Sequence, residues 1–347
     1  MDAVILVLSF VLILAGAELF TNGIEWFGRK LELAEGAVGS VLAAVGTALP
    51  ETMIPIIAIL FSTGEHSDGI GVGAVLGAPF MLATLAMFVT GTAVLVMARR
   101  RPDGDVMRVD PRSLALDMRT FAVTYAIAIG AAFLPAEATW PKWVIAVVLL
   151  VIYGWYVKGH FEADPSVDLE DLAPLRFHRL DRQARRAEPH IPRLRIVNLQ
   201  VLGALSLIVI GATTFVGAVE HIGDGLGLDA VLLALVIAPI ATELPEKFNS
   251  IIWVRQGKDA LAMGNITGAM VFQSAIPTAV ALVFAPAAWS VTGGASIAFL
   301  SAGIGLASSA FVFLPMIRNG RLRGRGLLVG GVFYVGYLAV AISTLAG

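Results

Sequence analysis

The chain has 347 residues, of which 57% are hydrophobic and 14% charged, and its mean hydropathy is +0.83. A typical soluble domain is roughly one-quarter charged, so this composition excludes a soluble protein and indicates a membrane protein with several spans. The net charge of −2 excludes a generally basic nucleic-acid binder, and the absence of cysteine excludes disulfide frameworks, thiolate metal sites and cysteine nucleophiles.

Ten apolar segments follow one another along the chain. Because about 20 apolar residues cross the core of a bilayer, each segment predicts a transmembrane helix, and the fold class is all-α, a polytopic membrane protein. The second, third, seventh and eighth segments are interrupted by Gly and Pro, a pattern typical of the helices that carry binding sites in transporters. The predicted spans are 3–20, 35–60, 69–98, 118–136, 141–158, 196–219, 227–254, 259–287, 295–317 and 326–346.

The basic residues fall in alternate loops. All but two of the 24 Lys and Arg residues, Lys142 and Lys247, lie between spans on the same side of the predicted membrane. The positive-inside rule makes this side cytoplasmic and places both termini outside. We therefore expect a multi-pass protein of the cell (inner) membrane. Glu25, in the first cytoplasmic loop, is expected to be solvated.

A constant offset of 195 relates the two halves of the chain. Residues 16–51 match residues 211–246 without a gap, and the match ends by pairing Glu51 with Glu246. Five spans, an odd number, separate equivalent points, so the two halves cross the membrane in opposite senses. Such inverted repeats are typical of transporters that hold their substrate near the midplane, where the repeats meet. We predict a first membrane repeat over 1–158, a cytoplasmic linker over 159–195 and a second membrane repeat over 196–347.

Each repeat carries the same intramembrane motif, Thr-x-Leu-Pro-Glu. A carboxylate at mid-span costs roughly 2.5–3.5 kcal/mol on insertion scales, so Glu51 and Glu246 are functional candidates. The proline of each motif has no N–H, so the carbonyl one turn before it loses its helical partner. Carbonyl, hydroxyl and carboxylate oxygens together suit hard cations such as Ca²⁺, Na⁺ or Mg²⁺. The predicted ion site comprises Glu51 and Glu246 as metal ligands, with Thr47, Thr242, Gly46 and Ala241. The alternative is that both glutamates are kinked-helix residues, paired to hydroxyls or protonated.

The two motifs resemble the alpha-repeats of the sodium/calcium exchangers, within the cation/Ca²⁺ antiporter superfamily. Residues 16–20 and 45–51 resemble the first repeat, and residues 241–246 and 264–268 are similar to the second, so the similarity covers nearly the whole chain. The resemblance implies a secondary active antiporter that exchanges Ca²⁺ for Na⁺ or H⁺ by alternating access at one midplane site. In that family the motif glutamates bind the cations, the threonines assist, and the first and sixth spans slide across the site as the gate.

The sequence also departs from the family pattern, which indicates a divergent member of prokaryotic type. Its third span, at residues 73–79, lacks the Asn and Ser side chains that usually complete the coordination. The eighth span keeps Asn265 and has Gln273 two turns later, and both are counted as ion-binding residues. The second motif adds Glu243, also counted as ion-binding, and Lys247, which at i and i+4 can pair with it. Since Lys247 can stand in for a bound cation, we expect it to modulate the site through altered stoichiometry or H⁺ coupling.

Two alternatives stay open from the sequence. The chain is an H⁺-coupled exchanger of another cation, or a non-transporting paralogue that keeps the fold after losing ligands from its third span. An enzyme is not expected, because the weakly protease-like Gly223-Asp224 lies in a short outer loop without a partner Asp within a span. The expected partners are the lipid bilayer and inorganic cations. We expect no cofactor, no nucleic acid and, without a Walker A loop, no nucleotide.

Overall fold

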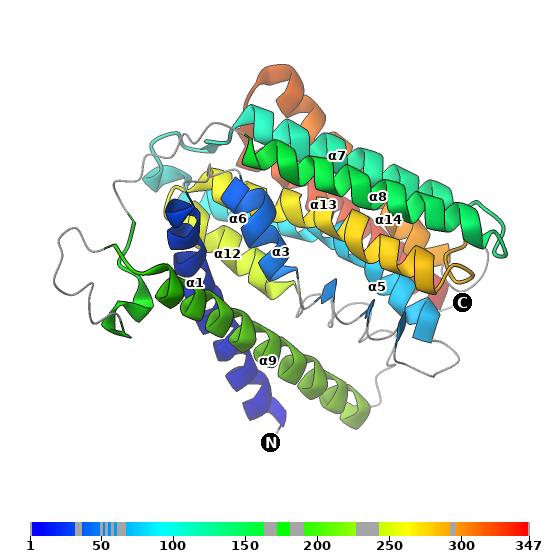
Figure 1. Cartoon of the computed structure of the whole chain (residues 1–347), viewed down its shortest axis with the longest axis horizontal. Coiled ribbons are helices and arrows are strands. Elements are labelled where there is room, and N and C mark those ends of the chain that lie inside the picture. The colour runs from blue at the N-terminus through cyan, green and yellow to red at the C-terminus, as the bar shows by residue number, and fades with distance from the viewer. Residues whose placement is uncertain are drawn as a thin grey trace.

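The computed structural model describes residues 2–31, 37–48, 51–52, 55–56, 59–60, 67–162, 172–180, 191–226, 243–291 and 296–345. These residues are almost entirely helical, as Figure 1 shows, which confirms the predicted all-α class. The helices are α1 (Asp2–Lys30), η1 (Val38–Ala43), α3 (Ala44–Thr47), α5 (Ser67–Met81), η2 (Leu82–Ala86), α6 (Met87–Met97), η3 (Ala98–Arg100), α7 (Pro111–Ala131), α8 (Thr139–Phe161), η4 (Arg176–Leu180), α9 (Leu194–Leu226), α12 (Leu244–Arg255), α13 (Asp259–Phe284), α14 (Ser296–Asn319), α15 (Gly324–Leu327) and α16 (Val329–Leu345).

Eight of the described helical segments are long and apolar enough to cross a membrane, from Val7–Lys30 to Gly324–Ala341. They correspond to eight of the ten predicted spans and confirm a multi-pass membrane architecture. The other two predicted spans, 35–60 and 227–254, lie partly outside the described residues. Within them the structure describes η1 with α3, and α12.

Helix α13 lies at the centre of the bundle and is buried along nearly its whole length, with α5, α7, α8, α12 and η1 packed around it (Figure 1). Its residues are mostly apolar or small on every side of the helix, which fits a buried position. Two glycines bring η1 into direct backbone contact with it. A Cβ added at Gly264 would lie 3.0 Å from the Ser40 nitrogen, and one added at Gly268 would overlap the Ser40 backbone.

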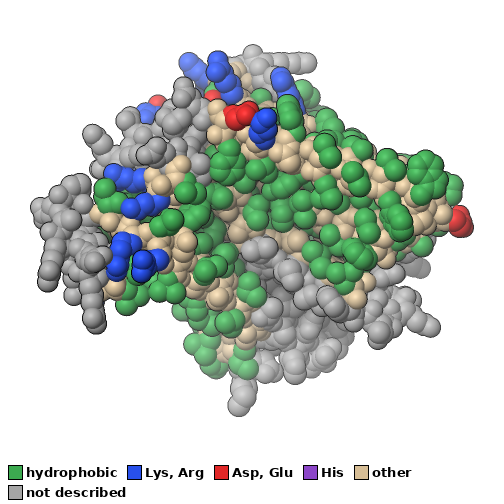
Figure 2. All heavy atoms as spheres, in the orientation of Figure 1, with side chains coloured by type: hydrophobic (Ala, Val, Ile, Leu, Met, Phe, Trp, Pro, Cys, Tyr) green, Lys and Arg blue, Asp and Glu red, His purple; other side chains and the backbone are tan. Residues whose placement is uncertain are grey.

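Helix α8 lies at the outer surface of the bundle. It exposes Trp140, Val144, Val147, Val151 and Trp155, which are spaced three or four residues apart and so share one face. Figure 2 shows hydrophobic side chains covering this side of the molecule. A continuous apolar face of this length matches a surface that contacts lipid.

Helices α1 and α9 cross each other beside the bundle (Figure 1). At the crossing, Gly16 faces Ile208 and Gly211 faces Ile13. A Cβ added at either glycine would lie 2.8 or 2.9 Å from the Cγ1 atom of the facing isoleucine, so only glycine permits this approach. The offset of 195 interchanges the two contacts, because it relates Gly16 to Gly211 and Ile13 to Ile208.

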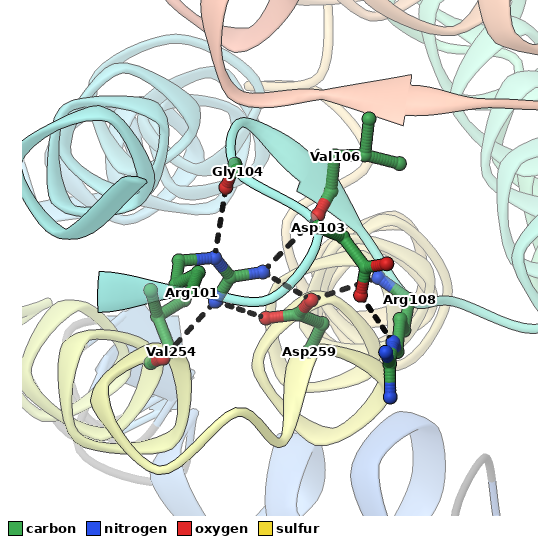
Figure 3. A network of polar contacts seen from close by, with 7 residues as sticks. All are labelled: Arg101, Asp103, Gly104, Val106, Arg108, Val254 and Asp259. Atoms are coloured by element: carbon green, nitrogen blue, oxygen red, sulfur yellow. Dashed lines mark hydrogen bonds and ion pairs between the residues drawn. The ribbon is translucent and has the colours of Figure 1, made fainter. Parts of the chain in front are cut away.

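One end of the bundle is fixed by a buried ion pair between the loop after η3 and the start of α13 (Figure 3). Arg101 donates to both carboxylate oxygens of Asp259, at 2.9 and 2.5 Å, and to the Val254 carbonyl at 3.1 Å. The backbone N–H of Arg108 donates to the same carboxylate at 2.8 Å. Beside this network the two-residue strands β1 (Val106–Met107) and β2 (Leu322–Arg323) pair antiparallel.

The described part of the predicted linker lies against α1 and α9. The indole N–H of Trp26, on α1, donates to the Ala173 carbonyl at 2.9 Å. The Gln200 side chain, on α9, accepts a hydrogen bond from the Phe177 N–H at 2.8 Å. Residues 172–180 therefore join the two crossed helices to each other.

Candidate ion-binding site

The first motif lies where α3 ends. Thr47 is the last residue of α3, which continues directly from the π-helix η1. Isolated π-helical turns are frequent at functional sites, and the C-terminal end of a helix carries partial negative charge that favours cations. Gly46 is buried, and a Cβ there would lie 2.6 Å from the Phe20 ring of α1, so α1 crosses directly over the motif. Leu49 and Pro50 lie outside the described residues.

The second motif lies where α12 begins. This helix starts at Leu244, and Pro245 and Glu246 stand in its first turn. Proline suits this position, because the first N–H groups of a helix have no partner within it. The predicted ligands Thr242 and Ala241 lie outside the described residues.

Glu51 and Glu246 are buried close together. Glu51 is 6% exposed and Glu246 is fully buried, and their carboxylates are near enough to interact electrostatically. None of their four carboxylate oxygens has a hydrogen-bond partner among the residues that the structure describes. Because an unpaired buried carboxylate is costly, this arrangement fits a pair of oxygen ligands for a cation.

A polar contact from α13 joins the two motifs. Thr47 Oγ1 donates to Asn265 Oδ1 at 3.1 Å, and Asn265 Nδ2 lies 3.5 Å from the Glu246 carbonyl oxygen. Thr47 and Asn265 are both fully buried. The structure thus brings together three of the predicted site residues, from three separate helices.

Lys247 lies against Glu243 on α12. Its Nζ atom is 2.8 Å from Glu243 Oε2, and both side chains are buried. Glu243 is also within electrostatic reach of Glu51. Because the charges of Lys247 and Glu243 cancel each other, the net charge of the site is that of the Glu51 and Glu246 carboxylates. Two negative charges match one divalent cation or two monovalent ones.

Two further amides are buried with free hydrogen-bonding atoms. Gln273, on α13, is 1% exposed, and neither of its amide atoms has a hydrogen-bond partner within the described ranges. Asn249, on α12, is fully buried and was missed by the sequence analysis. Thr21 donates to Asn249 Oδ1 at 2.7 Å, and Asn249 Nδ2 has no partner in the described part of the chain. Its spacing of three from Glu246, which places it on the same helix face, is the signal that could have found it.

Carboxylates alone do not surround the site. No group of three or more His, Cys, Asp or Glu side chains is arranged to hold a metal ion within the ranges described above. Coordination of a cation between Glu51 and Glu246 therefore depends on amide, hydroxyl and carbonyl oxygens, which Ca²⁺ accepts readily.

The expectation that Glu25 is solvated is wrong. Glu25 is 8% exposed, its Oε1 accepts a hydrogen bond from Trp253 Nε1 at 3.0 Å, and its Oε2 lies 2.7 Å from Lys258 Nζ. These contacts tie the end of α1 to the corner between α12 and α13. A cavity of about 620 Å³ lies beside them, lined by residues that include Glu25, Lys258 and Thr21.

The chain as a whole is similar to known proteins. A family model described as "Sodium/calcium exchanger protein" matches residues 1–159 and 197–344. The protein named "Putative antiporter CaxA" from Alkalimonas amylolytica is 24% identical over 346 residues, which is 98% of each chain. The inner membrane protein YrbG of Escherichia coli (strain K12) is 23% identical over 275 residues, covering 78% of this chain and 76% of YrbG.

Solved structures share the fold. A structure of the sodium-calcium exchanger NCX_Mj, soaked with 2.5 mM Na⁺ and 1 mM Sr²⁺, matches with a TM-score of 0.72 at 17% identity and covers 97% of each chain. The same exchanger soaked with 2.5 mM Na⁺ and 0.1 mM Ca²⁺ matches with a TM-score of 0.71 at 16% identity. The fold is therefore common to this chain and that exchanger.

Proposed function

The chain belongs to the sodium/calcium exchanger protein family and is a membrane cation antiporter, and we propose that it exchanges Ca²⁺ for H⁺ or Na⁺ at one site between its two motifs. The observation that carries this proposal is the joint burial of Glu51 and Glu246, whose carboxylate oxygens are unpaired in the described part of the chain. A divalent cation supplies the positive charge that these two side chains lack.

The proposed ligands are oxygen atoms from both repeats. Glu51 and Glu246 are the metal ligands, and the oxygens of Thr47 and Asn265 lie between the motifs. Ca²⁺ takes six to eight oxygens, so further ligands are needed. The additional ligands proposed from the sequence are Gln273, Glu243, Thr242 and the carbonyls of Gly46 and Ala241.

The charge of the site favours an exchange of one Ca²⁺ for two monovalent cations. Lys247 balances Glu243 at 2.8 Å, so Glu51 and Glu246 are neutralised either by one Ca²⁺ or by two protons or Na⁺ ions. A proton needs only a carboxylate oxygen, whereas Na⁺ needs several oxygen ligands. Because residues 73–79 carry no Asn or Ser side chain, the site supports H⁺ coupling better than Na⁺ coupling.

The crossed helices support alternating access. Phe20 of α1 lies against Gly46 at the first motif, and the symmetric crossing of α1 with α9 supports inverted repeats over 1–158 and 196–347. We assign the gating movement to this helix pair and the connection between repeats to the cytoplasmic linker, 159–195. The protein lies in the inner membrane with both termini outside.

The test is ⁴⁵Ca²⁺ uptake into proteoliposomes that contain the purified protein, with the opposing H⁺ and Na⁺ gradients imposed independently. We expect an H⁺ gradient to drive uptake at least as well as a Na⁺ gradient. Uptake that responds only to Na⁺ contradicts H⁺ coupling, and uptake of another divalent cation in preference to Ca²⁺ contradicts the ion assignment. Calorimetric binding of Ca²⁺ without any flux would identify a non-transporting paralogue.

A further inference from the structure

A buried polar cluster lies beside α13, apart from the ion site. Its centre is Asp117, on α7, which is 1% exposed. The Asp117 carboxylate accepts hydrogen bonds from Ser40 Oγ at 2.8 Å, from Tyr156 Oη at 3.0 Å and from Thr267 Oγ1. It also lies 2.7 Å from His160 Nε2. These five residues, called the Asp117 cluster below, include none of the proposed ion ligands.

Ser40 is held at the point where η1 touches α13. The glycines of α13 bring the two backbones together there, because a Cβ added at Gly264 would lie 3.0 Å from the Ser40 nitrogen. Asp117 binds the Ser40 side chain, and Tyr156 Oη also donates to the Ser40 carbonyl oxygen at 3.1 Å. The side chain and the backbone of Ser40 are therefore fixed together, from α7 and from α8.

Ser40 stands inside the π-helical turn η1, Val38–Ala43. A π-turn contains about one residue more than an α-turn, so it rotates the residues that follow by roughly 100° about the helix axis. Because such turns are rare in helices, the contacts that fix Ser40 also favour this one. The direction in which the following helix presents its side chains thus depends on η1.

The orientation set at η1 is passed on to the first motif. Helix α3 follows η1 directly, and two further i to i+4 backbone hydrogen bonds, at 3.0 and 3.1 Å, extend the helical spacing as far as Thr52. Thr47 and Glu51 are four residues apart, so they share one helix face. A rotation at η1 would therefore turn both side chains away from Asn265 and from the second motif.

The same carboxylate also fixes α13. Thr267, which donates to Asp117, lies two residues after Asn265, so the two side chains project from nearly opposite sides of the helix. Asn265 accepts the hydrogen bond from Thr47 at 3.1 Å. Asp117 therefore holds both segments that supply this contact, although it makes no hydrogen bond to either motif glutamate.

The second repeat has no equivalent of the Asp117 cluster. The offset of 195 relates Asp117 to Val312 and Ser40 to Leu235, and neither counterpart is polar. The cluster therefore acts on the first motif alone, whereas the second motif stands in the first turn of α12.

We propose that Asp117 is a positioning residue of the ion site: by holding Ser40 it keeps the π-turn in η1, and it thereby points Thr47 and Glu51 at the cation. This role rests on the proposed function, because the first motif has to bind the ion. It requires no change of protonation at any residue of the Asp117 cluster. Loss of the hydrogen bond between Asp117 and Ser40 is expected to lower the affinity for Ca²⁺, because the ligands of the first motif are then less well placed.

Ser40→Ala is the variant that tests this role. It removes one hydrogen bond to Asp117, and a cavity of about 20 Å³ that borders both residues can hold a water molecule in place of the hydroxyl. Asp117→Leu is more direct, but it leaves several buried donors without an acceptor and so endangers folding. We expect calorimetry on the purified full chain to give a Ca²⁺ Kd about tenfold higher in Ser40→Ala than in wild type.

Ser308→Ala is the matched control. Ser308, on α14, is fully buried and donates at 2.7 Å to the Ala83 carbonyl of η2, a second π-turn. The chemical change is the same, but η2 leads into α6, which carries none of the proposed ligands, so the wild-type Kd is expected. An unchanged Kd in Ser40→Ala overturns the positioning role of Asp117. An equal rise in the two variants overturns it too, because the effect would then come from packing.

A readout that needs no ion separates this role from the exchange function. Hydrogen–deuterium exchange of the backbone amides in residues 38–48 is expected to be about tenfold faster in Ser40→Ala than in wild type, and unchanged in Ser308→Ala. If this difference appears in a protein that does not bind Ca²⁺, the proposed function fails while the hold of Asp117 on η1 stands. If Glu51→Gln loses Ca²⁺ binding but Ser40→Ala exchanges deuterium at the wild-type rate, the ion site stands and the positioning role fails.

Discussion

The motif glutamates present carboxylates with no hydrogen-bond partner in the described structure, so replacing one by Gln removes charge and almost no volume. We expect Glu51→Gln and Glu246→Gln each to lower Ca²⁺ exchange by at least about a hundredfold, because each leaves half of the required negative charge. Tracer uptake and calorimetric Ca²⁺ binding measure the effect. Glu18→Gln is the control, since Glu18 is 58% exposed and pairs with Arg176 at 2.7 Å. Uptake by Glu51→Gln at the wild-type rate would remove the basis of the site.

Lys247 pairs with Glu243 beside the motif glutamates, so its replacement changes the charge of the proposed site. Lys247→Gln leaves Glu243 without its partner at 2.8 Å, so the site holds three carboxylates and no ammonium. We expect the variant to require an additional monovalent cation per Ca²⁺ and its uptake rate to become sensitive to an imposed membrane potential, to which wild type is insensitive. Lys158→Gln, at an exposed lysine, should behave like wild type. A potential-independent Lys247→Gln variant would contradict the charge balance.

Single residues differ in how far their roles could be read from the sequence. Glu51 and Glu246 stand out because a charge inside an apolar segment needs an explanation, and the repeat offset pairs them. Asn249 did not stand out, because its partner Thr21 is 228 residues away and an amide near a helix end is unremarkable by itself. Glu25 was misread for the same reason, since Trp253 and Lys258 reach it only through the tertiary fold.

At the level of helices, α1 meets α9 and α12 through contacts of different kinds. It crosses α9 through interlocked glycines, and it meets α12 through the Thr21–Asn249 hydrogen bond. If α1 and α9 slide together, a covalent link between them is harmless, whereas a link between α1 and α12 stops the movement.

The absence of native cysteine makes this distinction measurable. We expect oxidation or bifunctional cross-linking of Thr21→Cys with Asn249→Cys to lower exchange at least about tenfold, reversibly on reduction. The matched pair is Asn22→Cys with Gln200→Cys, on α1 and α9, whose native side chains are hydrogen-bonded to each other at 2.9 Å. Inhibition by the second pair, or none by the first, would mean that α1 does not move against α12.

The Arg101 network predicts a stability effect at one corner of the bundle. Arg101→Ala leaves the buried carboxylate of Asp259 without its cation, which costs about 3–5 kcal/mol of folding free energy. Arg108→Ala, which removes a side chain that is 67% exposed, is expected to cost no more than about 0.5 kcal/mol. Unfolding temperatures in detergent provide the measurement. Equal shifts in the two variants would show that the buried ion pair does not hold this corner.

Hydropathy located the helices well but did not reveal their local form. Apolar length is a property of the segment itself, so eight predicted spans coincide with described membrane-length helices. The π-helices η1 and η2, by contrast, depend on which neighbour packs against them. The Gly and Pro residues of the predicted span 227–254 indicated an interruption, but not that a helix, α12, begins at Leu244.

For the whole molecule, the predicted orientation can be tested with single cysteines in the cysteine-free chain. Glu137→Cys lies in a loop predicted to face outward, and Arg321→Cys lies in a basic loop predicted to face the cytoplasm. An impermeant thiol reagent applied to intact cells is expected to label Glu137→Cys alone, because the positive-inside rule orients the chain. Membrane disruption should expose the second site as a control. The reverse pattern would place both termini in the cytoplasm.

The overall topology of the protein was more predictable than the contacts between its segments. A repeat offset and a count of spans are enough to expect two inverted halves, since both are properties of the linear sequence. The packing of residues 172–180 against α1 and α9 could not be predicted from the sequence. Trp26 and Gln200 form hydrogen bonds to backbone atoms of this segment, and backbone atoms are the same in every sequence.

The symmetric crossing of α1 and α9 has a consequence for the direction of travel. The repeat relation interchanges the contact of Gly16 with Ile208 and the contact of Gly211 with Ile13. A tilt of the helix pair toward one membrane face is therefore equivalent, by this symmetry, to a tilt toward the other face. If this crossing carries the proposed gating movement, its two tilted positions are nearly equal in energy. A transporter built in this way has little preferred direction of its own. When the ion gradient is reversed, exchange in the opposite direction should reach a comparable rate.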